Sequence, residues 1–510
     1  FIMKMYLILF LTGIALFTNG QNVGIGTSSP NSSAALDVNA TNKGMLIPRI
    51  TTVQRNAIGN PAMGLLVFDT DKSTVMFYDG TAWRSLSFSD ENKTDPQSRS
   101  STQPALSAGF GTRVSISGNF AIIGAPRYGA TGLLNMGVAY IFNKTSGGWK
   151  QVARLAARDS AAGDYFGGSV AISGDYAIVG TSNKTINQKV AQGASYVFLR
   201  SGNNWLLDTI LQKPNGLAYE NFGWAVGICA FNTGGPGIAI GIPYSDAGGA
   251  DRGEVYFYKK TGSAWSFIQN IIPTDLLNAD YYGFSIASDT DYVAIGATGQ
   301  DNALYAYADA GAAYIYAYGG GVWNFQQKLQ GTTARGQFGF ALSLSSNKLA
   351  VGAPWATTYN NTSSSVNIYT RTGSSWANTT SLFIYNFEVV PNAGQIQPIA
   401  GSTSISIANL TFGISLSLAG NILLVGASGG THYPNGGSSY YSDRIGAVYV
   451  YKNFSGNTYT RTNIMQSEFP GNGDLFGQTV SISGNNYVIG SPNAIINGLV
   501  NAGNVYFGAQ

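Results

Sequence analysis

Acidic side chains come in close pairs in two segments of this 510-residue sequence. Asp246 and Asp251 form one pair, and Asp301 and Asp309 form the other. Two carboxylates that converge on a sugar can hydrolyse a glycosidic bond, by a mechanism that depends on the distance between them. A carbohydrate-active enzyme, either a hydrolase or a lyase, is therefore one hypothesis for the function of this chain.

Other catalytic chemistry has little support in the sequence. The single histidine, His432, excludes metal motifs that need two or more histidines. The sequence also shows no Gly-x-Ser-x-Gly in the strand-to-helix context of a nucleophile elbow, and no glycine-rich loop of the kind that holds phosphates between a strand and a helix. We therefore predict that the protein is not an enzyme, and that it holds neither a cofactor nor a metal ion.

Aromatic and polar side chains are concentrated in segments of variable length. Tyr and Trp offer a large contact area at a low entropic cost, and polar side chains add hydrogen bonds. Such a mixture suits a sugar or a loop of another protein, and the alternative is a set of solvated turns that pack on one another. The candidate ligand-binding residues are Tyr128, Tyr244, Asp246, Asp251, Tyr305, Tyr307, Asp309, Trp355, Tyr359, His432, Tyr433, Tyr441 and Asp443.

An aromatic residue followed by glycine recurs from residue 110 onward, and similar sequence surrounds each copy. A repeat of this length indicates a propeller, a solenoid or an array. The seven openings are Phe110-Gly111, Phe166-Gly167, Phe222-Gly223, Tyr282-Gly283, Phe338-Gly339, Phe412-Gly413 and Phe476-Gly477.

Each copy predicts four short strands. An apolar segment leads to a Gly-Asp or Gly-Asn pair, which indicates a tight hairpin because such turns need positive φ. A second apolar run ends on glycine, as in AIIGAP at 121–126, and a third follows a variable loop, as in GVAYIF at 137–142. The fourth strand begins near a tryptophan such as Trp149.

Four strands joined by hairpins form one antiparallel sheet. The first two strands are almost continuously apolar, so we expect neighbouring sheets to cover both of their faces. The predicted fold class is all-β: a seven-bladed β-propeller of four-stranded antiparallel blades, preceded by a small β-rich module. An open array of hairpins is disfavoured because it leaves apolar edges exposed. The loops between strands two and three would share one face with the connections between blades, and this loop-rich face would carry the candidate residues.

The last copy ends after its third strand, GNVYFGAQ at 503–510. A propeller closes when one terminus supplies the strand that the other terminus lacks. The segment TAWRSLSF at 81–88 resembles the tryptophan-led fourth strands and is the predicted closing strand, with 105–108 as the second choice.

An acid also recurs three residues before the glycine of four openings. A ring of functional carboxylates is one interpretation, but we favour a structural role. A carboxylate before a tight turn accepts backbone N–H groups and fixes the start of the first strand. These turn carboxylates are Asp164, Glu220, Asp280 and Asp474.

The Phe-Gly openings, together with Gly124-Ala125-Pro126 and Gly352-Ala353-Pro354, resemble FG-GAP repeats. Such repeats build the integrin α-chain propeller and occur in many secreted bacterial proteins. The resemblance implies a propeller, and an adhesion function. Calcium-binding members carry an Asp-rich loop between the first two strands, and the nearest approach here is Asp289-Thr290-Asp291. Because calcium takes six to eight oxygen ligands, we predict no family-type calcium site.

The composition limits the kinds of molecule that this chain is expected to bind. Charged residues make up 10% of the chain, against about 25% in an average domain. The net charge of +3 is too small to indicate binding to nucleic acid or to an anionic membrane. The single cysteine, Cys229, cannot form an intrachain disulfide and is predicted to be a buried thiol.

The chain begins with segments unlike the repeats. Residues 1–20 resemble a secretory signal, with Lys4 before an apolar stretch at 6–17 that is too short to span a membrane. Residues 21–88 resemble an N-terminal module of bacterial surface proteins and tail-fibre-like proteins, through the segments 22–27, 33–38, 43–49, 64–70 and 77–83. That resemblance implies an attachment or homo-oligomerisation module. Residues 89–109 are polar with two prolines and predict a linker before a propeller at 110–510.

The sequence as a whole predicts a secreted or cell-surface recognition and adhesion protein. Its propeller would bind an extracellular glycan or protein, without a transmembrane segment once the signal is removed. The alternatives are the carbohydrate-active enzyme and a structural component of a surface fibre.

Overall fold

A computed structural model describes residues 23–85, 97–100 and 107–510, apart from 73, 131, 203, 232–234, 357–363, 384–410, 430–445, 456–457 and 468–472. The chain divides into two compact units, Phe1–Lys93 and Thr94–Gln510. The predicted signal at 1–20 lies outside the described residues. Within those residues, no helix has the length and apolar character needed to cross a membrane.

The first unit contains two small sheets. Strand β1 (Val23–Ile25) pairs in parallel with β2 (Leu36–Val38). The second sheet has the order β3-β4-β5-β6, with bounds Arg49–Ile50, Leu66–Asp69, Thr74–Tyr78 and Trp83–Ser85. Helix α1 (Thr52–Asn56) begins with a capping box, in which Thr51 and Gln54 each accept the backbone N–H of the other.

A buried carboxylate organises the second of these sheets. Asp69 lies 3.5 Å from Arg55 and accepts hydrogen bonds from the Thr52 hydroxyl and the N–H of Lys72. Burial raises the pKa of Asp69, but these hydrogen bonds and the charge of Arg55 lower it overall. The module therefore relies on polar contacts as much as on its few buried apolar side chains.

The second unit is built from four-stranded antiparallel sheets. Six sheets, among the residues that the structure describes, each consist of four consecutive strands. Their bounds are Arg113–Ser117, Phe120–Ala125, Val138–Thr145 and Gly148–Leu155 for β8–β11; Ser169–Ser173, Tyr176–Thr181, Ala194–Ser201 and Asn204–Leu211 for β12–β15; Ala225–Ala230, Pro236–Ile242, Glu254–Thr261 and Ala264–Ile271 for β16–β19; Tyr282–Asp289, Tyr292–Ala297, Ala312–Gly319 and Val322–Gln330 for β20–β23; Ala341–Ser345, Lys348–Ala353, Ser365–Thr372 and Ser375–Phe383 for β24–β27; and Ser415–Ala419, Ile422–Ala427, Ala447–Ser455 and Thr458–Met465 for β28–β31. A further sheet has the order β32-β33-β34-β7, with bounds Thr479–Ser483, Asn486–Ser491, Asn504–Ala509 and Gln97–Arg99.

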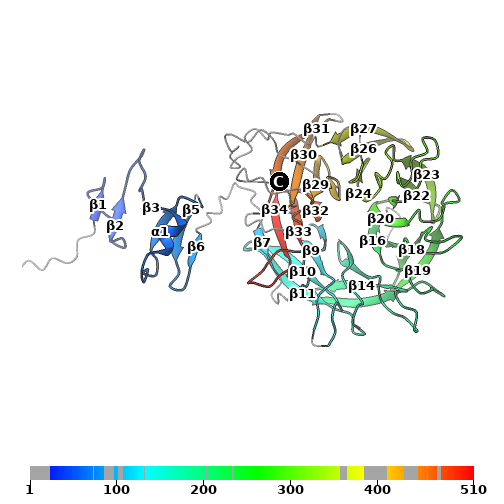
Figure 1. Ribbon diagram of the computed structural model, residues 1–510, viewed down its shortest axis with the longest axis horizontal. Coiled ribbons are helices and arrows are strands. Elements are labelled where there is room, and N and C mark those ends of the chain that lie inside the picture. The colour runs from blue at the N-terminus through cyan, green and yellow to red at the C-terminus, as the bar shows by residue number, and fades with distance from the viewer. Residues whose placement is uncertain are drawn as a thin grey trace, which may run out of the picture. The chain divides into compact units, whose positions relative to one another are not determined.

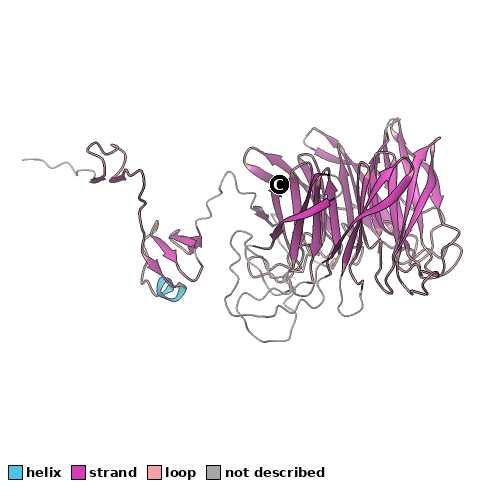
Figure 2. Ribbon diagram, turned by 90° about the horizontal axis from the view of Figure 1, so that it is seen from above, coloured by secondary structure: helices cyan, strands magenta, loops and turns pink. Residues whose placement is uncertain are grey.

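These sheets form a closed ring. The first strand of each sheet packs against the first strand of the next, and β32 packs back against β8. Figure 1 shows first strands such as β16, β20 and β24 toward the centre of the ring and fourth strands such as β19, β23 and β27 at its outside, and Figure 2 shows the ring from its side. The predicted all-β, propeller-like fold is confirmed.

The hydrophobic cores lie between adjacent sheets. One core combines Ile122 and Ile141 of the first sheet with Phe166 and Val179 of the second. Another joins Val114 and Phe142 to Val505 of the last sheet, across the point where the ring closes. Both faces of the inner strands are therefore covered, which explains why their sequences are almost continuously apolar.

The glycines of the repeat make adjacent sheets meet backbone to backbone. The opening glycine Gly167 has a φ of 91° and donates its N–H to the carbonyl of Gly180 in its own sheet, at 3.1 Å. A Cβ added to Gly124, which ends the second strand of the preceding sheet, would come closer than 3.0 Å to the carbonyl oxygen of Gly167. The same contact recurs at the pairs Gly180–Gly223, Gly241–Gly283, Gly296–Gly339, Gly352–Gly413, Gly426–Gly477 and Gly490–Gly111.

Serine side chains add hydrogen bonds between inner strands. Ser115 accepts the N–H of Ile172 in the next sheet at 3.2 Å. At the closure, Ser481 of the last sheet accepts the N–H of Ile116 at 3.1 Å. The junction between the last and first sheets thus uses the same contacts as the internal junctions.

The strand that completes the last sheet is not the predicted one. Strand β7 (Gln97–Arg99) pairs antiparallel with β34, with Arg99 opposite Val505. It lies inside the segment 89–109 that the sequence predicted to be a linker. Residues 81–88 were the wrong choice because Trp83–Ser85 forms β6, paired with β5 across a short turn that an ion pair of 2.8 Å between Arg84 and Asp79 supports. A local hairpin of this kind closes at a lower entropic cost than a distant pairing.

The second choice, 105–108, is also wrong where it is described. Ser107 donates its N–H to the carbonyl of Val500 at 2.9 Å, and Gly109 donates to Asn501 at 3.0 Å. These partners belong to the loop before β34, not to its free edge. Residues 105 and 106 lie outside the described residues.

The glycine contact predicts a large effect of a single methyl group. We expect Gly180→Ala to lower the free energy of unfolding of the second unit by about 3 kcal/mol, because the added Cβ overlaps the backbone of Gly223. Gly174→Asn is the control, since a Cβ there meets nothing within 4 Å and Asn tolerates its φ of 55°. Urea denaturation of both variants checks the prediction, and equal stabilities would contradict it.

If β7 closes the ring, disrupting it should speed amide hydrogen exchange locally, in the strand that it pairs with. Replacing Gln97, Ser98 and Arg99 together by proline removes every N–H that β7 can donate to β34. We expect amide hydrogen exchange to accelerate in β34, while the sheet of β16–β19 keeps its protection. Unchanged exchange in β34 would show that β7 does not close the ring in solution.

Candidate functional site

The variable loops and the connections between sheets form one layer at one end of the ring. Gly163, in the connection to the second sheet, donates its N–H to the carbonyl of Leu134, in the loop between β9 and β10, at 2.9 Å. Tyr281 and Gln337 make the equivalent bonds to the carbonyls of Asp251 and Asp309, both at 3.2 Å. The two loop sets therefore support each other as a single surface, which we call the loop layer.

Not every candidate residue can be placed in this layer. Tyr359, His432, Tyr433, Tyr441 and Asp443 lie outside the described residues. The others are described, and the structure separates them into distinct groups. Tyr128 packs under the guanidinium of Arg154, at 4.9 Å, in the first sheet.

Tyr305 and Tyr307 form a second group, in the loop of the fourth sheet. Their rings stack with centroids 5.6 Å apart and an interplanar angle of 23°. The N–H groups of both residues bond to Asn302, whose side chain is buried and donates to Gly331 at 2.6 Å. The pair, of which Tyr305 is exposed and Tyr307 half-buried, is therefore held from below by an ordered turn.

The largest group is a continuous row of six aromatic rings from three consecutive sheets. Trp224, Phe284 and Phe340 directly follow the opening glycines of these sheets. The ring centroid of Phe284 lies 5.7 Å from that of Trp224 and 5.1 Å from that of Phe340. Tyr244 contacts Trp224 at 5.1 Å and Tyr281 at 5.5 Å. Trp355 extends the other end, 4.6 Å from Phe340.

We call these six residues the aromatic row. All are half-buried except Trp355, which is 41% exposed. The candidates Tyr244 and Trp355 belong to it, whereas sequence reasoning missed Trp224, Tyr281, Phe284 and Phe340. It searched the loops between strands two and three, although an aromatic residue directly after the opening pair in three consecutive repeats was a usable signal.

The corresponding positions in the other sheets of the ring are not aromatic. The residues that follow the opening glycine there are Thr112, Gly168, Ile414 and Gln478. Nearby, Arg127 donates to the side chain of Asn493 at 2.9 Å, and Asn221 donates to the carbonyl of Ser182 at 3.1 Å. Aromatic residues directly after the opening glycine are therefore confined to three consecutive sheets, and polar side chains occur elsewhere in the layer.

The two acid pairs are joined within their loops. Asp246 accepts the N–H of Asp251 at 3.0 Å, and Asp301 accepts the N–H of Asp309 at 2.9 Å. Asp251 and Asp309 have φ values of 51° and 50°. In each pair, one carboxylate thus shapes the left-handed turn that carries the other.

Asp251 lies close to the aromatic row. Burial and the charge of Asp246 raise the pKa of Asp251. Burial, Tyr281 and Asp251 in turn raise the pKa of Tyr244. This end of the row therefore combines rings with a carboxyl group that holds its proton more strongly than an ordinary aspartate.

The recurring acids lie beneath the loop layer and bond to backbone. Asp164, Glu220 and Asp280 are buried and accept the N–H of Ala161, Leu217 and Leu277 at 2.8, 2.7 and 2.7 Å. Asp474 is also buried. Lys184 pairs with Asp164 at 3.1 Å, and Gln300 donates to Asp280 at 3.1 Å. These acids hold the connection between one sheet and the next.

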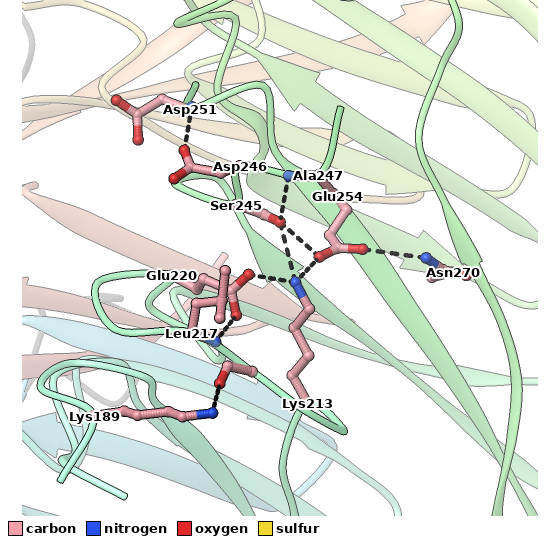
Figure 3. A network of polar contacts seen from close by, with 11 residues as sticks. Lys189, Lys213, Leu217, Glu220, Ser245, Asp246, Ala247, Asp251, Glu254 and Asn270 are labelled. Carbon is pink, nitrogen blue, oxygen red and sulfur yellow. Dashed lines mark hydrogen bonds and ion pairs between the residues drawn. The ribbon is translucent and has the colours of Figure 1, made fainter. Parts of the chain in front are cut away.

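Glu220 belongs to a buried charged network, drawn in Figure 3. The ammonium of Lys213 lies 2.5 Å from both Glu220 and Glu254, and 3.2 Å from the hydroxyl of Ser245. Ser245 donates to Glu254 at 2.7 Å. Burial lowers the pKa of Lys213, but the two carboxylates raise it overall. One lysine thus balances two buried acids beneath the loop of Asp246.

Neither metal chemistry nor thiol chemistry has a site in the part of the chain that the structure describes. No group of three or more His, Cys, Asp or Glu side chains is placed there to hold a metal ion. Cys229 is buried, and burial raises the pKa of its thiol to about 12. Binding through aromatic and polar contacts is the chemistry that these residues offer.

The fold and the loop layer define an all-β repeat protein of the propeller type. Residues 104–142, 149–198, 265–316 and 470–507 match the FG-GAP repeat, and residues 24–102 match the phage tail like trimerisation region. Both resemblances expected from the sequence are confirmed. The fold is similar to Sqt1 of Saccharomyces cerevisiae, with 10% identity, a TM-score of 0.39, and coverage of 79% of this chain and 84% of that one. No curated protein matches the sequence.

The charged network predicts a stability change with a defined pH range. We expect Lys213→Met to lower the free energy of unfolding by about 3 kcal/mol at pH 7, because it leaves two buried carboxylates without their cation. Since the pKa of Lys213 is raised in the folded protein, its stabilisation is present below the ordinary lysine value of about 10.4 and is lost as pH rises through the folded value.

The measurement is urea denaturation of wild type and variant at several pH values. The difference should be constant from about pH 7 to about pH 10 and should shrink above that. Lys189→Met is the control, since Lys189 makes one hydrogen bond to the carbonyl of Gly216 and its loss costs about 1 kcal/mol. A loss no larger for Lys213→Met than for the control would contradict the prediction.

Proposed function

We propose that this protein is an exported recognition or adhesion protein whose loop layer binds a glycan, with a protein ligand as the second candidate. The observation that carries the proposal is the aromatic row. Six half-buried or exposed rings in contact with one another offer a surface far larger than a single residue provides. FG-GAP repeats are consistent with a propeller-type surface protein.

A glycan suits the chemistry beside the row. The C–H faces of a sugar pack against aromatic rings, and its hydroxyl groups need donors and acceptors at the rim. Asp251 lies near Tyr244 at one end of the row, with Asp246 beside it, and the loop layer also contains the polar side chains of Arg127, Asn221 and Gln478. Asn221 and Gln478 are amides, whereas Arg127, Asp246 and Asp251 are ionisable, so together these groups offer both donors and acceptors to sugar hydroxyls.

The position of the row supports binding rather than packing alone. Trp224, Phe284 and Phe340 stand at the starts of inner strands that pack between neighbouring sheets, so holding them in place costs little entropy on binding. The loops around them vary in length while the scaffold repeats, which is how binding sites are commonly built on repeated folds. Export is supported by the signal-like sequence at 1–20.

One observation favours the rival function of a carbohydrate-active enzyme. The raised pKa of Asp251, beside the carboxylate of Asp246 and the rings of Tyr244 and Tyr281, is the setting in which a carboxyl group serves as a general acid. We propose binding in preference, because the carboxylate of Asp246 is engaged in shaping its own loop.

The test is a screen of glycans and surface proteins with the whole chain, repeated with Phe340→Ala. We expect a ligand whose dissociation constant rises at least tenfold in the variant, about 1.4 kcal/mol, because one ring of the row is lost. Phe325→Ala is the matched control, as Phe325 lies on the outer strand β23 and is 57% exposed. It should bind like wild type.

The other outcomes separate the rivals. Equal affinity of wild type and Phe340→Ala would refute the role of the row. Release of sugar products that is lost in Asp251→Asn would establish the enzyme. Regular assemblies that bind neither glycan nor protein would favour a structural fibre component.

A further inference from the structure

The fifth sheet of the ring, β24–β27, departs from the repeat at three positions. In the other six sheets, as the structure describes them, the third strand carries a buried tyrosine, and the equivalent residue here is Asn367. Eight and three residues before the opening glycine, where the second sheet carries Asp159 and Asp164, the fifth has Gly331 and Gly336. The six tyrosines, none more than 8% exposed, are Tyr140, Tyr196, Tyr256, Tyr314, Tyr449 and Tyr506.

In those six sheets the tyrosine ring packs edge-to-face against the opening aromatic residue, with centroids 5.0–6.0 Å apart. Its hydroxyl can then reach an acid, as Tyr196 does when it donates to Asp159 at 2.6 Å. The opening residue of the fifth sheet, Phe338, contacts Tyr369 instead, at 6.3 Å. Substitution of the tyrosine by Asn367 therefore removes a ring from one side of Phe338.

A cavity of about 70 Å³ lies where these three side chains are missing, between the fourth and fifth sheets. One water needs only about 10–15 Å³ on this scale, so the cavity has room for a larger group. It reaches the surface, because two of the residues that line it, Thr332 and Asn378, are exposed. The lining also includes Gly331, Gly336, Phe338 and Asn367. We call this space the fifth-sheet pocket.

The walls of the fifth-sheet pocket are polar but uncharged. No described residue that lines it is an acid, a lysine or an arginine. The amide of Asn367 is held in place, since its oxygen accepts the hydroxyl of Ser381 at 2.7 Å. Burial raises the pKa of Tyr369 to about 12, so this lining side chain keeps its proton at neutral pH. An aromatic wall and neutral hydrogen-bonding groups suit a flat, uncharged ring that carries a hydroxyl group.

We propose that the fifth-sheet pocket binds a phenolic ring, such as the tyrosine side chain of a partner protein, in the place that the chain's own tyrosine takes in the other sheets. A cavity left by a missing side chain keeps the shape of that side chain, which is why cavities made in protein cores bind benzene. Phe338 supplies the edge-to-face contact. Asn367 and Thr333, which both line the pocket, take over from the acids as partners of the phenol hydroxyl.

This site is separate from the one proposed above. None of the six residues of the aromatic row lines the fifth-sheet pocket. The row consists of aromatic residues that three sheets add to the repeat, whereas the pocket arises from side chains that one sheet has lost. The inference therefore does not rest on the proposed function, and either can fail without the other.

The test is calorimetric titration of the whole chain with p-cresol, which is the side chain of tyrosine as a free molecule. We expect the dissociation constant to rise at least tenfold in Asn367→Phe, because the new ring fills the pocket and needs no partner for a hydroxyl. Asn324→Phe is the matched control, since Asn324 is exposed on the outer strand β23, and it should bind like wild type. No binding to wild type, or equal binding to Asn367→Phe, would overturn the proposal.

A second measurement keeps the test independent of the folding of Asn367→Phe. Crystals of the wild type soaked in p-cresol should show its ring edge-to-face with Phe338. Water alone in the pocket, or a methyl glucoside bound there in preference to p-cresol, would overturn the proposal.

A short peptide separates the two sources of a phenolic ring. If the natural ligand is a tyrosine of a partner protein, Gly-Tyr-Gly should displace p-cresol, and Gly-Ala-Gly should not. If Gly-Tyr-Gly fails while p-cresol binds, the pocket is a site for a small free phenol, and the partner protein is refuted.

Discussion

The close approach of two glycine backbones at each junction between sheets is the constraint on which the ring depends. The glycine of the opening pair and the glycine at the end of the preceding second strand leave no room for a Cβ, and the same pairing occurs from Gly124–Gly167 round to Gly490–Gly111. This distance sets how closely the inner strands can pack. It also lets the opening aromatic residue, such as Phe166, sink fully between sheets. The glycines recur in the sequence because each junction between sheets imposes the same steric requirement.

A scaffold held in this way leaves other positions free to vary. The residue after the opening glycine is tryptophan or phenylalanine in three consecutive sheets and is not aromatic in the others, without any change in the junction itself. Variation at one repeated position thus creates an aromatic side in a ring of similar sheets. The loops above are longer and less regular, yet the same backbone bonds to the neighbouring connection recur in described loops, as Tyr281 to Asp251 and Gln337 to Asp309 show.

Buried polar groups play the complementary role of holding the loop layer in place. The chain has few charges, and several of them lie beneath the layer instead of on the surface. Lys213, Glu220 and Glu254 join the second and third sheets, and Asp164 with Lys184 does the same between the first and second. In the first unit, the buried ion pair of Asp69 and Arg55 likewise stabilises a sheet with a small apolar core. Fixed polar contacts below a surface make the arrangement of the side chains above it reproducible.

The sequence by itself determined the strand order within each repeat, the FG-GAP character and the turn position of the recurring acids, because hairpins and tight turns depend on residues close together in the chain. It did not determine which segment closes the ring: Trp83–Ser85 resembled a fourth strand, but its local hairpin with β5 excluded it and β7 took the edge of β34. Nor did it group Trp224, Phe284 and Phe340, which lie far apart in sequence and meet only because the inner strands of adjacent sheets stand side by side. Contacts between repeats join residues that are far apart in the sequence, so only the tertiary structure decides which of them meet.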